Sequence, residues 1–369
     1  MNINWLDNIE DQLVNYLYSL QNKKNGYHFL PAKNSLTEAG KTLTLGFSCY
    51  SMKLHYILNL FTELNMNSKE WASYINSFQK ISSFSPENSY IDDNYVKQYN
   101  KFNLSKSFKS VVKTSLNLSG QFQFESKNTY LEKSIRAETK QAIASLSQLE
   151  VKSKFKYKDF PQTSKEINSF LDSYDWTKPW DAGAQFSGLC VFTSTQLEDF
   201  DKNKLSIENY IDKLANQEYG LYYKEKLPNK NEAINGAMKV ISGLDWLDIP
   251  IHYPEKLIDF CLLSTPDSTG CDLVDYVYVL YKCSEQTKYR KKEIVLYCEE
   301  LLKLIENHFY DEGGFSYYIG KSQTHYYGVK ITKDYNQPDI HGTLLFVWAL
   351  SMIFNLLETG KFDWKVIKP

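Results

Sequence analysis

The chain has 369 residues, of which 43% are hydrophobic and 23% are charged, and its formal net charge is −2. This balance excludes general disorder. The near-neutral net charge gives no excess of positive charge that would indicate binding to nucleic acid or to an anionic membrane. Two features of the composition are unusual. Aromatic residues make up 15% of the chain, and its 42 basic residues include just two arginines, Arg136 and Arg290.

The N-terminal sequence and the cysteines point to a reducing compartment. The first residues contain no basic segment followed by an apolar stretch, so they predict no signal peptide. No apolar run approaches the roughly 20 residues that span a bilayer. The six cysteines form no CxxC pair, and several lie in apolar helical runs, as small buried side chains do. We therefore expect a cytoplasmic protein with no integral membrane segment.

Apolar residues at helical spacing predict six pairs of helices. Several pairs are interrupted by a glycine followed by aromatic residues, as at Gly26, Gly220 and Gly313-Gly314, and Ser83-Phe84-Ser85 is a degenerate copy. In chain order, the predicted pairs are 5–21 with 42–60, 71–81 with 129–146, 164–173 with 181–195, 207–217 with 234–244, 254–263 with 272–283, and 294–310 with 340–357.

Repetition of helix pairs every 45–65 residues is typical of a stacked array or a closed ring. Six pairs close naturally into an all-α (α/α)6 toroid, with the second helices inside because they carry little charge. The sequence therefore predicts one domain spanning residues 1–369. The polar segment 94–128 shows little helical pattern and is expected to be a long insertion, for which a β-hairpin is an option.

If the inner helices run parallel, their N-termini open at one mouth of the ring, where helix dipoles favour an anionic group. Unusual polar residues do cluster at these predicted helix starts. The aspartates among them can equally be N-caps, and Arg136 can equally pair with Glu138 or Asp181. The candidate substrate-binding residues at these starts are Arg136, Glu138, Trp180, Asp181, Gln185, Asn235, Lys239 and Asp275.

The segment from Gly313 to Thr343 is rich in polar and aromatic residues and contains two of the six histidines. Placed over the mouth of the ring, such a loop can supply a general acid or base. The alternative is a packed loop whose histidines bond to backbone groups. The candidate catalytic residues are His325, Tyr326, Asp339 and His341, with Tyr327 as a substrate-binding candidate.

Metal binding is the weaker option for these residues. Asp275, Asp339 and His341 can face one ion across the ring, but no cysteine lies in register to complete a typical zinc site with thiolate ligands. Zinc is therefore disfavoured as a cofactor. The aromatic excess either fills the helix interfaces or lines a cavity for a sugar ring or an isoprenoid chain.

The motif Gly-Gly-Phe-Ser, followed by a helix that begins Asp-Ile-His-Gly-Thr, resembles the repeats of the terpenoid cyclase and protein prenyltransferase superfamily. The resemblance implies the toroid fold, and it places His341 and Asp275 at the positions of the family's zinc ligands. Val277 stands where the family has a cysteine ligand. The Asp-x-Asp-Asp acid motif of class II cyclases is absent, and the nearest string is Tyr90-Ile-Asp-Asp93.

Three functions remain open from the sequence. The first is an enzyme acting on an isoprenoid by acid–base chemistry, with Arg136, Asn235 and Lys239 binding an anionic group. The second is a lyase, epimerase or hydrolase for uronic-acid sugars, using Asn235, His325, Tyr326 and Arg136. The third is a non-catalytic scaffold. The substrate, the reaction and the oligomeric state do not follow from the sequence.

Overall fold

The structure is a computed structural model that describes residues 4–63, 67–101 and 127–369. The described chain is mostly helical, with three two-stranded antiparallel sheets, which confirms the all-α class. A short 3-10 helix, Asn4–Leu6, precedes the first α-helix. The α-helices are α1 (Ile9–Leu20), α2 (Glu38–Thr42), α3 (Leu45–Ile57), α4 (Leu60–Glu63), α5 (Ser68–Asn76), α6 (Asp93–Asn100), α8 (Lys127–Gln148), α9 (Ser164–Asp172), α10 (Pro179–Gln196), α11 (Asp201–Ile211), α12 (Lys230–Leu247), α13 (Pro254–Leu262), α14 (Gly270–Gln286), α15 (Lys291–Glu306) and α16 (Ile340–Leu356).

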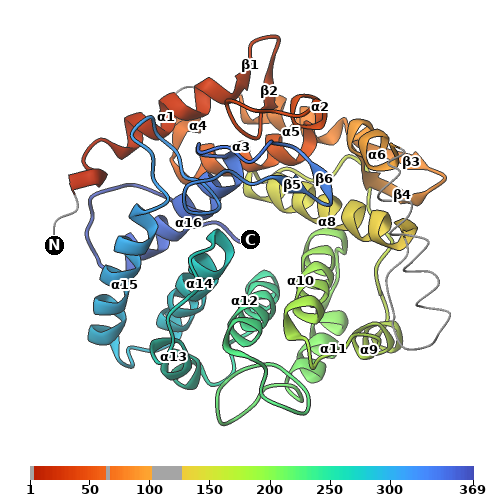
Figure 1. Ribbon diagram of the computed structural model, residues 1–369. Helices are drawn as coiled ribbons and strands as arrows, with labels where there is room; N and C mark the ends of the chain where they lie inside the picture. The colour runs from red at the N-terminus through yellow and green to blue at the C-terminus, as the bar shows by residue number, and fades with distance from the viewer. Residues whose placement is uncertain (1–3, 64–66, 102–126) are drawn as a thin grey trace, which may run out of the picture.

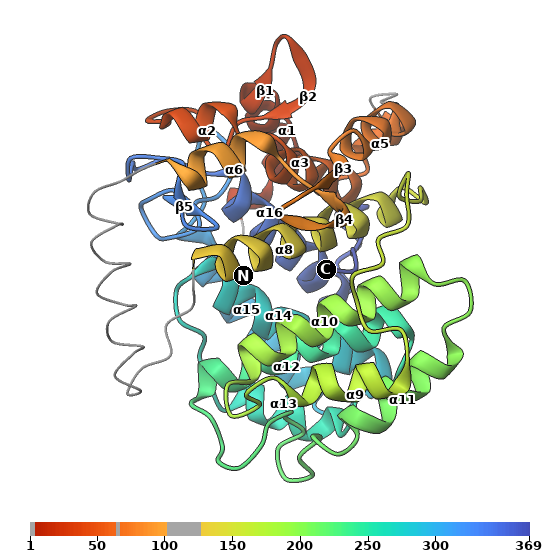
Figure 2. The same ribbon diagram turned by 90° about the vertical axis from the view of Figure 1, so that its right-hand side faces the viewer.

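Six helices contact one another in cyclic order. Helix α3 packs against α8, and the contacts continue through α10, α12 and α14 to α16, which packs back against α3. These helices surround the middle of the molecule in Figure 1, and Figure 2 shows α8, α10 and α12 running in similar directions. They are the second members of the six helix pairs predicted from the sequence. We call α3, α8, α10, α12, α14 and α16 the inner helices.

The remaining long helices are amphipathic and lie outside the inner helices (Figure 1). Helix α15 is a clear case, because its buried side chains Ile294, Cys298, Leu301, Leu302 and Ile305 share one face. Helix α16 is different, since buried residues occur all around it from Ile340 to Phe354. A helix that is apolar on all sides has neighbours on all sides, which explains why α16 contacts α3, α14 and α15.

Glycine residues bring α10 and α12 close together. A Cβ atom on Gly236 would lie 2.6 Å from Pro179 Cβ, and one on Gly183 would lie 3.0 Å from Gly236 O. A Cβ atom on Gly243 would lie 2.7 Å from the Phe186 ring. The absence of side chains at these positions therefore lets the two helix backbones approach closely.

Two segments cover opposite ends of the inner helices. The loop between α15 and α16 contains β5 (His325–Tyr326) and β6 (Val329–Lys330) and contacts the starts of α3, α8 and α14. The C-terminal segment 361–369 crosses the other end, where Lys365 N donates to Ile57 O at 2.8 Å. There Trp246 Nε1 also donates to Pro369 O at 2.8 Å.

The region around the predicted insertion differs in part from expectation. The predicted helix 71–81 ends at Asn76, and a hairpin of β3 (Gln79–Ser82) and β4 (Ser85–Tyr90) follows it. The beginning of segment 94–128 is helical in α6, because the Asp92 side chain caps the helix at Asn94 N and Tyr95 is buried. Residues 102–126 of the predicted insertion lie outside the described residues. The first sheet, β1 (Gln21–Asn22) with β2 (Asn25–Phe29), forms at the first predicted glycine break.

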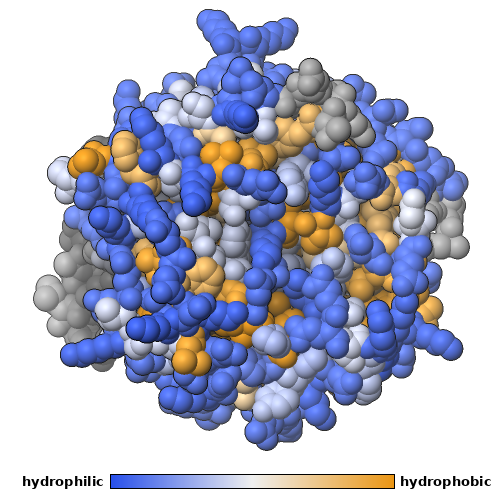
Figure 3. Space-filling view, turned by 180° about the vertical axis from the view of Figure 1, so that it is seen from behind, coloured by the Kyte–Doolittle hydropathy of each residue, from blue (hydrophilic) through white to orange (hydrophobic). Residues whose placement is uncertain are grey.

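The surface of the molecule shows no large apolar face in the view from behind. Hydrophobic residues appear there as separate small groups surrounded by hydrophilic residues (Figure 3). Among the described residues, none of the helices combines the length and the apolar character needed to span a bilayer.

Candidate functional site

A pocket of about 290 Å³ lies among α3, α8, α10 and α12. Five of its lining residues carry a basic side chain, and none of the described lining side chains is acidic. The lining also contains two amide side chains and two aromatic side chains. The lining consists of Lys53, Lys133, Arg136, Ala137, Lys140, Gln141, Ala144, Ala184, Gln185, Gly188, Phe192, Lys239, Tyr327 and Pro369. We refer to it as the central pocket.

Lys53, Lys140 and Lys239 enter the central pocket from three different helices. The Lys140 Nζ atom donates to Ser187 Oγ at 2.8 Å, but none of the three lysines forms an ion pair with a described residue. The side chains of Lys53 and Lys239 also have no hydrogen-bond partner within the described part of the chain. We call these three residues the lysine cluster.

Burial lowers the pKa of two members of the lysine cluster, and repulsion by like charges lowers the pKa of Lys140 further. Burial lowers the pKa of Lys53 to about 8. The pKa of Lys140 falls to about 7, first because of burial and then because the positive charges of Lys239 and Lys53 lie close by. Lys140 therefore exchanges its proton near neutral pH, which an exposed lysine does not do.

Arg136 borders the central pocket and has a structural partner. Its Nη1 atom donates to Asp159 O at 2.7 Å and lies 3.6 Å from Asp159 Oδ2. The guanidinium carbon lies 5.4 Å from the ring centre of Phe170 and 5.2 Å from that of Phe192. The alternative pairings with Glu138 or Asp181 are wrong, because the chain folds Asp159 against the guanidinium. Its Nη2 atom is buried without a protein partner.

Glu138 is buried near the pocket, on the same helix as Lys140. Its Oε1 atom accepts a hydrogen bond from the Tyr326 hydroxyl at 2.9 Å, while Oε2 has no partner among the described residues. Burial raises the pKa of Glu138 to about 8, and the charge of Asp92 adds to this increase. The carboxyl group is therefore largely protonated at neutral pH. The neighbouring Tyr327 lines the central pocket.

Asp275 and His341 both lie close enough to Lys239 for its charge to act on them. Burial raises the pKa of Asp275 to about 7, although the positive charge of Lys239 opposes the change. Burial and then Lys239 lower the pKa of His341 to about 4, so its ring is neutral. The imidazole is stacked between Tyr50 and Tyr317, at ring-centre distances of 4.9 and 5.2 Å. Asp275 Oδ2 and His341 Nδ1 are both buried without a partner among the described residues.

The zinc site implied by the family resemblance does not fit these residues. Asp275 and His341 face the positive charge of Lys239, which repels a dication, and Val277 offers no ligand atom. Within the described residues, no group of three or more histidine, cysteine or acidic side chains is arranged to hold a metal ion. We therefore derive no chemical step through zinc.

Other predicted site residues have places outside the central pocket. Asp339 is the N-cap of α16, and its oxygens accept from the backbone N–H groups of Gly342, Tyr317 and Gln323 at 2.8–2.9 Å. Burial raises the pKa of Asp339 to about 6. His325 is exposed and contacts Thr324 Oγ1 at 2.9 Å.

Three residues at the starts of α10 and α12 are also outside the lining of the pocket. The Asn235 amide donates to Asp272 Oδ1 at 2.9 Å in a buried contact between α12 and α14. Trp180 is 42% exposed at the start of α10, and Asp181 beside it is also exposed. Of the predicted substrate-binding residues, the structure brings Arg136, Gln185, Lys239 and Tyr327 together around the central pocket.

Sequence reasoning missed Lys53, Lys133 and Lys140. Lysine is so frequent in this chain that a single lysine carries little information. A usable signal was nevertheless present, because Lys53 interrupts the apolar run Ser51-Met-Lys-Leu54 in the body of a predicted inner helix. A lysine in the middle of an enclosed helix needs a reason to be there, since burying an ammonium group is costly.

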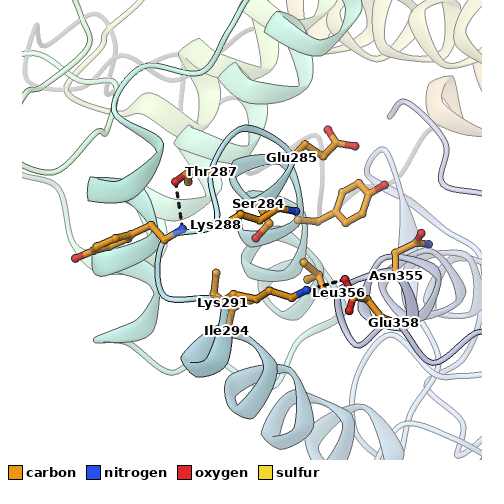
Figure 4. A pocket seen from close by; sticks show the side chains of 11 residues that line it. Ser284, Glu285, Thr287, Lys288, Lys291, Ile294, Asn355, Leu356 and Glu358 are labelled. Carbon is orange, nitrogen blue, oxygen red and sulfur yellow. Dashed lines mark hydrogen bonds and ion pairs between the residues drawn. The ribbon is translucent and has the colours of Figure 1, made fainter.

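A second pocket, of about 220 Å³, lies on the outside between the ends of α14, α15 and α16. Figure 4 shows that its side chains come from loop and helix-end residues, and that Lys291 points at Glu358. Their ion pair measures 2.6 Å. Lys291 and Glu358 therefore already neutralise each other, and both side chains are exposed to solvent. The central pocket is the stronger candidate site.

Comparison of the chain with family models, with curated proteins and with solved structures found no match.

Proposed function

We propose that the chain is an (α/α)6 toroid enzyme that binds a small anionic substrate in the central pocket and acts on it by acid–base chemistry. The cyclic contacts of the inner helices support the toroid. The single-domain organisation and the relation to the terpenoid cyclase and prenyltransferase superfamily are parts of the same proposal, and the motifs at the start of α16 support them.

The lysine cluster is the observation that carries the proposal. Three lysines line one partly open pocket, and none of them forms an ion pair with a carboxylate of the described residues, although the charge of Lys239 acts on Asp275. Unpaired like charges in a partly buried site raise the free energy of the folded protein. A bound phosphate, diphosphate or carboxylate removes this cost, because it supplies the opposite charge and accepts hydrogen bonds from the ammonium groups.

Two buried carboxyl groups near the central pocket, neither of which lines it, can move protons. Glu138 and Asp275 each have a buried oxygen without a partner, and the pKa of each carboxyl is raised by burial, to about 8 and about 7 respectively. Groups with such values can donate or accept a proton near neutral pH. In the proposed enzyme, the cations fix the anionic end of the substrate, and one of these carboxyl groups transfers the proton.

The lining favours a compact polar substrate over a long isoprenoid chain. The aromatic rings of the lining are Phe192 and Tyr327, whereas amides and cations form most of the polar wall. A sugar acid or a sugar phosphate matches both this chemistry and a volume of about 290 Å³. An isoprenoid diphosphate has an anionic end that the lysine cluster can bind, so it serves as the competing substrate in the test.

Isothermal titration calorimetry of the full chain tests the proposal. The probes are diphosphate, glucuronate and farnesyl diphosphate, and the variants are Lys53→Met and Lys239→Met. We expect each anion to bind the wild-type chain, and each variant to weaken diphosphate binding roughly tenfold, because a contact between opposite charges is lost. Lys256→Met is the matched control, because Lys256 is exposed on α13.

The outcomes separate the alternatives. Equal weakening by Lys256→Met, or no binding of any probe, contradicts the proposed site. Farnesyl diphosphate that binds at least tenfold more tightly than diphosphate contradicts the preference for a compact polar substrate and favours the isoprenoid enzyme. Glucuronate that binds as tightly as diphosphate supports the sugar-acid class.

A further inference from the structure

Lys140 differs from its two neighbours in the lysine cluster. It lies on α8, between Lys53 on α3 and Lys239 on α12, and the charges of both act on it. Lys140 borders the central pocket and is partly accessible, whereas most of the inner helix surface is buried. An amine close to two cations loses its proton more readily than an isolated amine, because its charged form is repelled.

Hydroxyl groups stand beside the Lys140 amine. Its Nζ atom lies 2.8 Å from Ser187 Oγ, which lies 2.8 Å from Ser242 Oγ. The Ser242 hydroxyl is within 2.8 Å of Lys239 O. This chain of hydroxyls ends at the backbone carbonyl of Lys239 and holds the Lys140 amine in place between α8, α10 and α12.

We propose that Lys140 is a nucleophilic lysine that forms an imine with an aldehyde or ketone substrate whose anionic group is held by Lys53 and Lys239. This inference rests on the proposed function, because it needs the central pocket to bind an anion. It names the substrate class more closely: a small carbonyl compound that also carries a phosphate or a carboxylate.

The chemical step balances within the site. The nitrogen lone pair of neutral Lys140 attacks the carbonyl carbon, a C–N bond forms, and the carbonyl oxygen takes up the proton that the nitrogen loses. A second proton, taken up from water in the pocket, lets this oxygen leave as water when the C–O bond breaks. The product is a protonated imine, and the positive charge of that proton remains on the imine nitrogen, while Lys53 and Lys239 keep their charges on the anionic group.

Pyridoxal 5′-phosphate is a suitable probe, because it carries both an aldehyde and a phosphate. The wild-type chain is treated with it at pH 7, reduced with borohydride and mapped by peptide mass spectrometry. We expect Lys140 to be modified roughly tenfold faster than the exposed Lys256, because a much larger fraction of a shielded, repelled amine is neutral. Pyridoxal, which lacks the phosphate, is the matched control and should modify Lys140 far more slowly.

The comparison of Lys140 with Lys256 takes place within one folded chain, so it does not depend on the folding of a variant. Modification of Lys140 no faster than Lys256 overturns the imine proposal. Equal rates with pyridoxal overturn the anionic substrate class. Diphosphate binding in the calorimeter, measured on the same sample, separates the two proposals: if it persists while Lys140 is unreactive, the imine fails and the proposed function stands.

Discussion

The environment of Lys140 lowers the stability of the folded protein and at the same time makes the amine more reactive. Its ammonium group is removed from water and lies near two like charges, and its one described polar contact is a neutral hydroxyl. The folded protein therefore pays a free-energy cost whenever this group is charged. Residues at functional sites often have this character, because their environment suits a reaction and not the folded state.

Replacing Lys140 with methionine should stabilise the free protein at low pH. The pKa of Lys140 is about 7 in the folded chain, through burial and then through Lys239 and Lys53, against 10.5 in the unfolded chain. The cost of charging it is fully present below pH 7, declines between pH 7 and 10.5, and disappears above that range. We expect Lys140→Met to raise the free energy of unfolding by about 2 kcal/mol at pH 6, after loss of the Ser187 bond is allowed for.

Urea unfolding at pH 6, 8 and 10 measures this effect. The gain from Lys140→Met should shrink steadily toward pH 10. A loss of stability at pH 6, or a gain that is the same at every pH, would show that Lys140 is an ordinary packed side chain.

Glu138 gives a prediction of opposite pH dependence. Burial, together with Asp92, raises its pKa from 4.5 in the unfolded chain to about 8 in the folded one. The folded state then binds more protons between these values, so the wild-type chain loses stability as the pH rises from 4.5 to 8. Glu138→Gln has no such proton to lose, and its amide oxygen can still accept from Tyr326. We expect the stability of Glu138→Gln relative to wild type to rise by about 2 kcal/mol across this window, measured by urea unfolding.

The conservative variant Tyr326→Phe serves as the control for Glu138. It removes the hydrogen bond that lowers the pKa of Glu138 and leaves the carboxyl group in place. The pH dependence should therefore remain or become steeper. If it disappeared, the titrating group would not be Glu138.

At the scale of elements, the contact between α10 and α12 depends on missing side chains. Gly236 faces the start of α10 at Pro179, and Gly183 faces the backbone of α12. This close contact sets the position of Lys239, which follows Gly236 by one turn and points its amine into the central pocket. The packing of two helices therefore determines the geometry of the lysine cluster.

Gly236→Ala tests this packing. The new Cβ atom would lie 2.6 Å from Pro179 Cβ and 2.9 Å from Pro179 C, so one helix must move. We expect a loss of about 1–3 kcal/mol in the free energy of unfolding, measured by urea denaturation. Gly188→Ala is the matched control. Gly188 also lies inside an inner helix, α10, but a Cβ atom there meets nothing within 4 Å.

The control should have the opposite sign. Alanine costs less conformational entropy than glycine within a helix, so Gly188→Ala should gain up to about 1 kcal/mol. Losses of similar size in both variants would mean that glycine at these positions matters for a reason other than helix contact.

The long inner helices were easier to predict from the sequence than the short elements between them. The inner helices are long and apolar, and each glycine break leaves a clear gap in the periodicity. The hairpin β3–β4 and helix α6 were not predicted, because they depend on distant contacts. Asp92 accepts from Thr44 N and Leu45 N, and Gln79 donates to Phe155 O. Such contacts leave no local pattern in the sequence.

The candidate site was partly predictable for a related reason. The starts of the inner helices indicated Arg136, Gln185 and Lys239, because unusual polar residues stand out in apolar helices. Lys53 and Lys140 did not stand out, because each is one more lysine among many; in the structure Arg136 and Lys239 also lie near the middle of α8 and α12. Lys53 and Lys140 come together because α3 and α8, which are far apart in the sequence, pack against each other in the fold.

For the whole molecule, binding of an anion should be coupled to proton uptake. An anion held by Lys53 and Lys239 raises the pKa of Lys53 from about 8, the value that burial gives it in the free protein. At pH 8, about half of the free chains lack this proton and take it up on binding. We expect uptake of about half a proton per chain with sulfate, an anion that does not titrate in this range.

Calorimetry of sulfate binding in buffers with different ionisation enthalpies measures this uptake. Lys53→Met should remove most of it, because the amine that takes up the proton is gone. Binding heat that does not depend on the buffer would contradict the coupling.

The contact between α16 and α3 also determines when the chain can finish folding. These helices are separated by most of the sequence, yet each covers an apolar face of the other. During synthesis, α3 leaves the ribosome long before α16 is translated, so its apolar face stays without this partner for that time. Contacts between distant segments slow folding, because bringing the segments together costs entropy before the contact adds any stability. The nascent protein therefore passes through an open, incomplete state that is prone to aggregation and to binding by chaperones, and the docking of α16 ends that state.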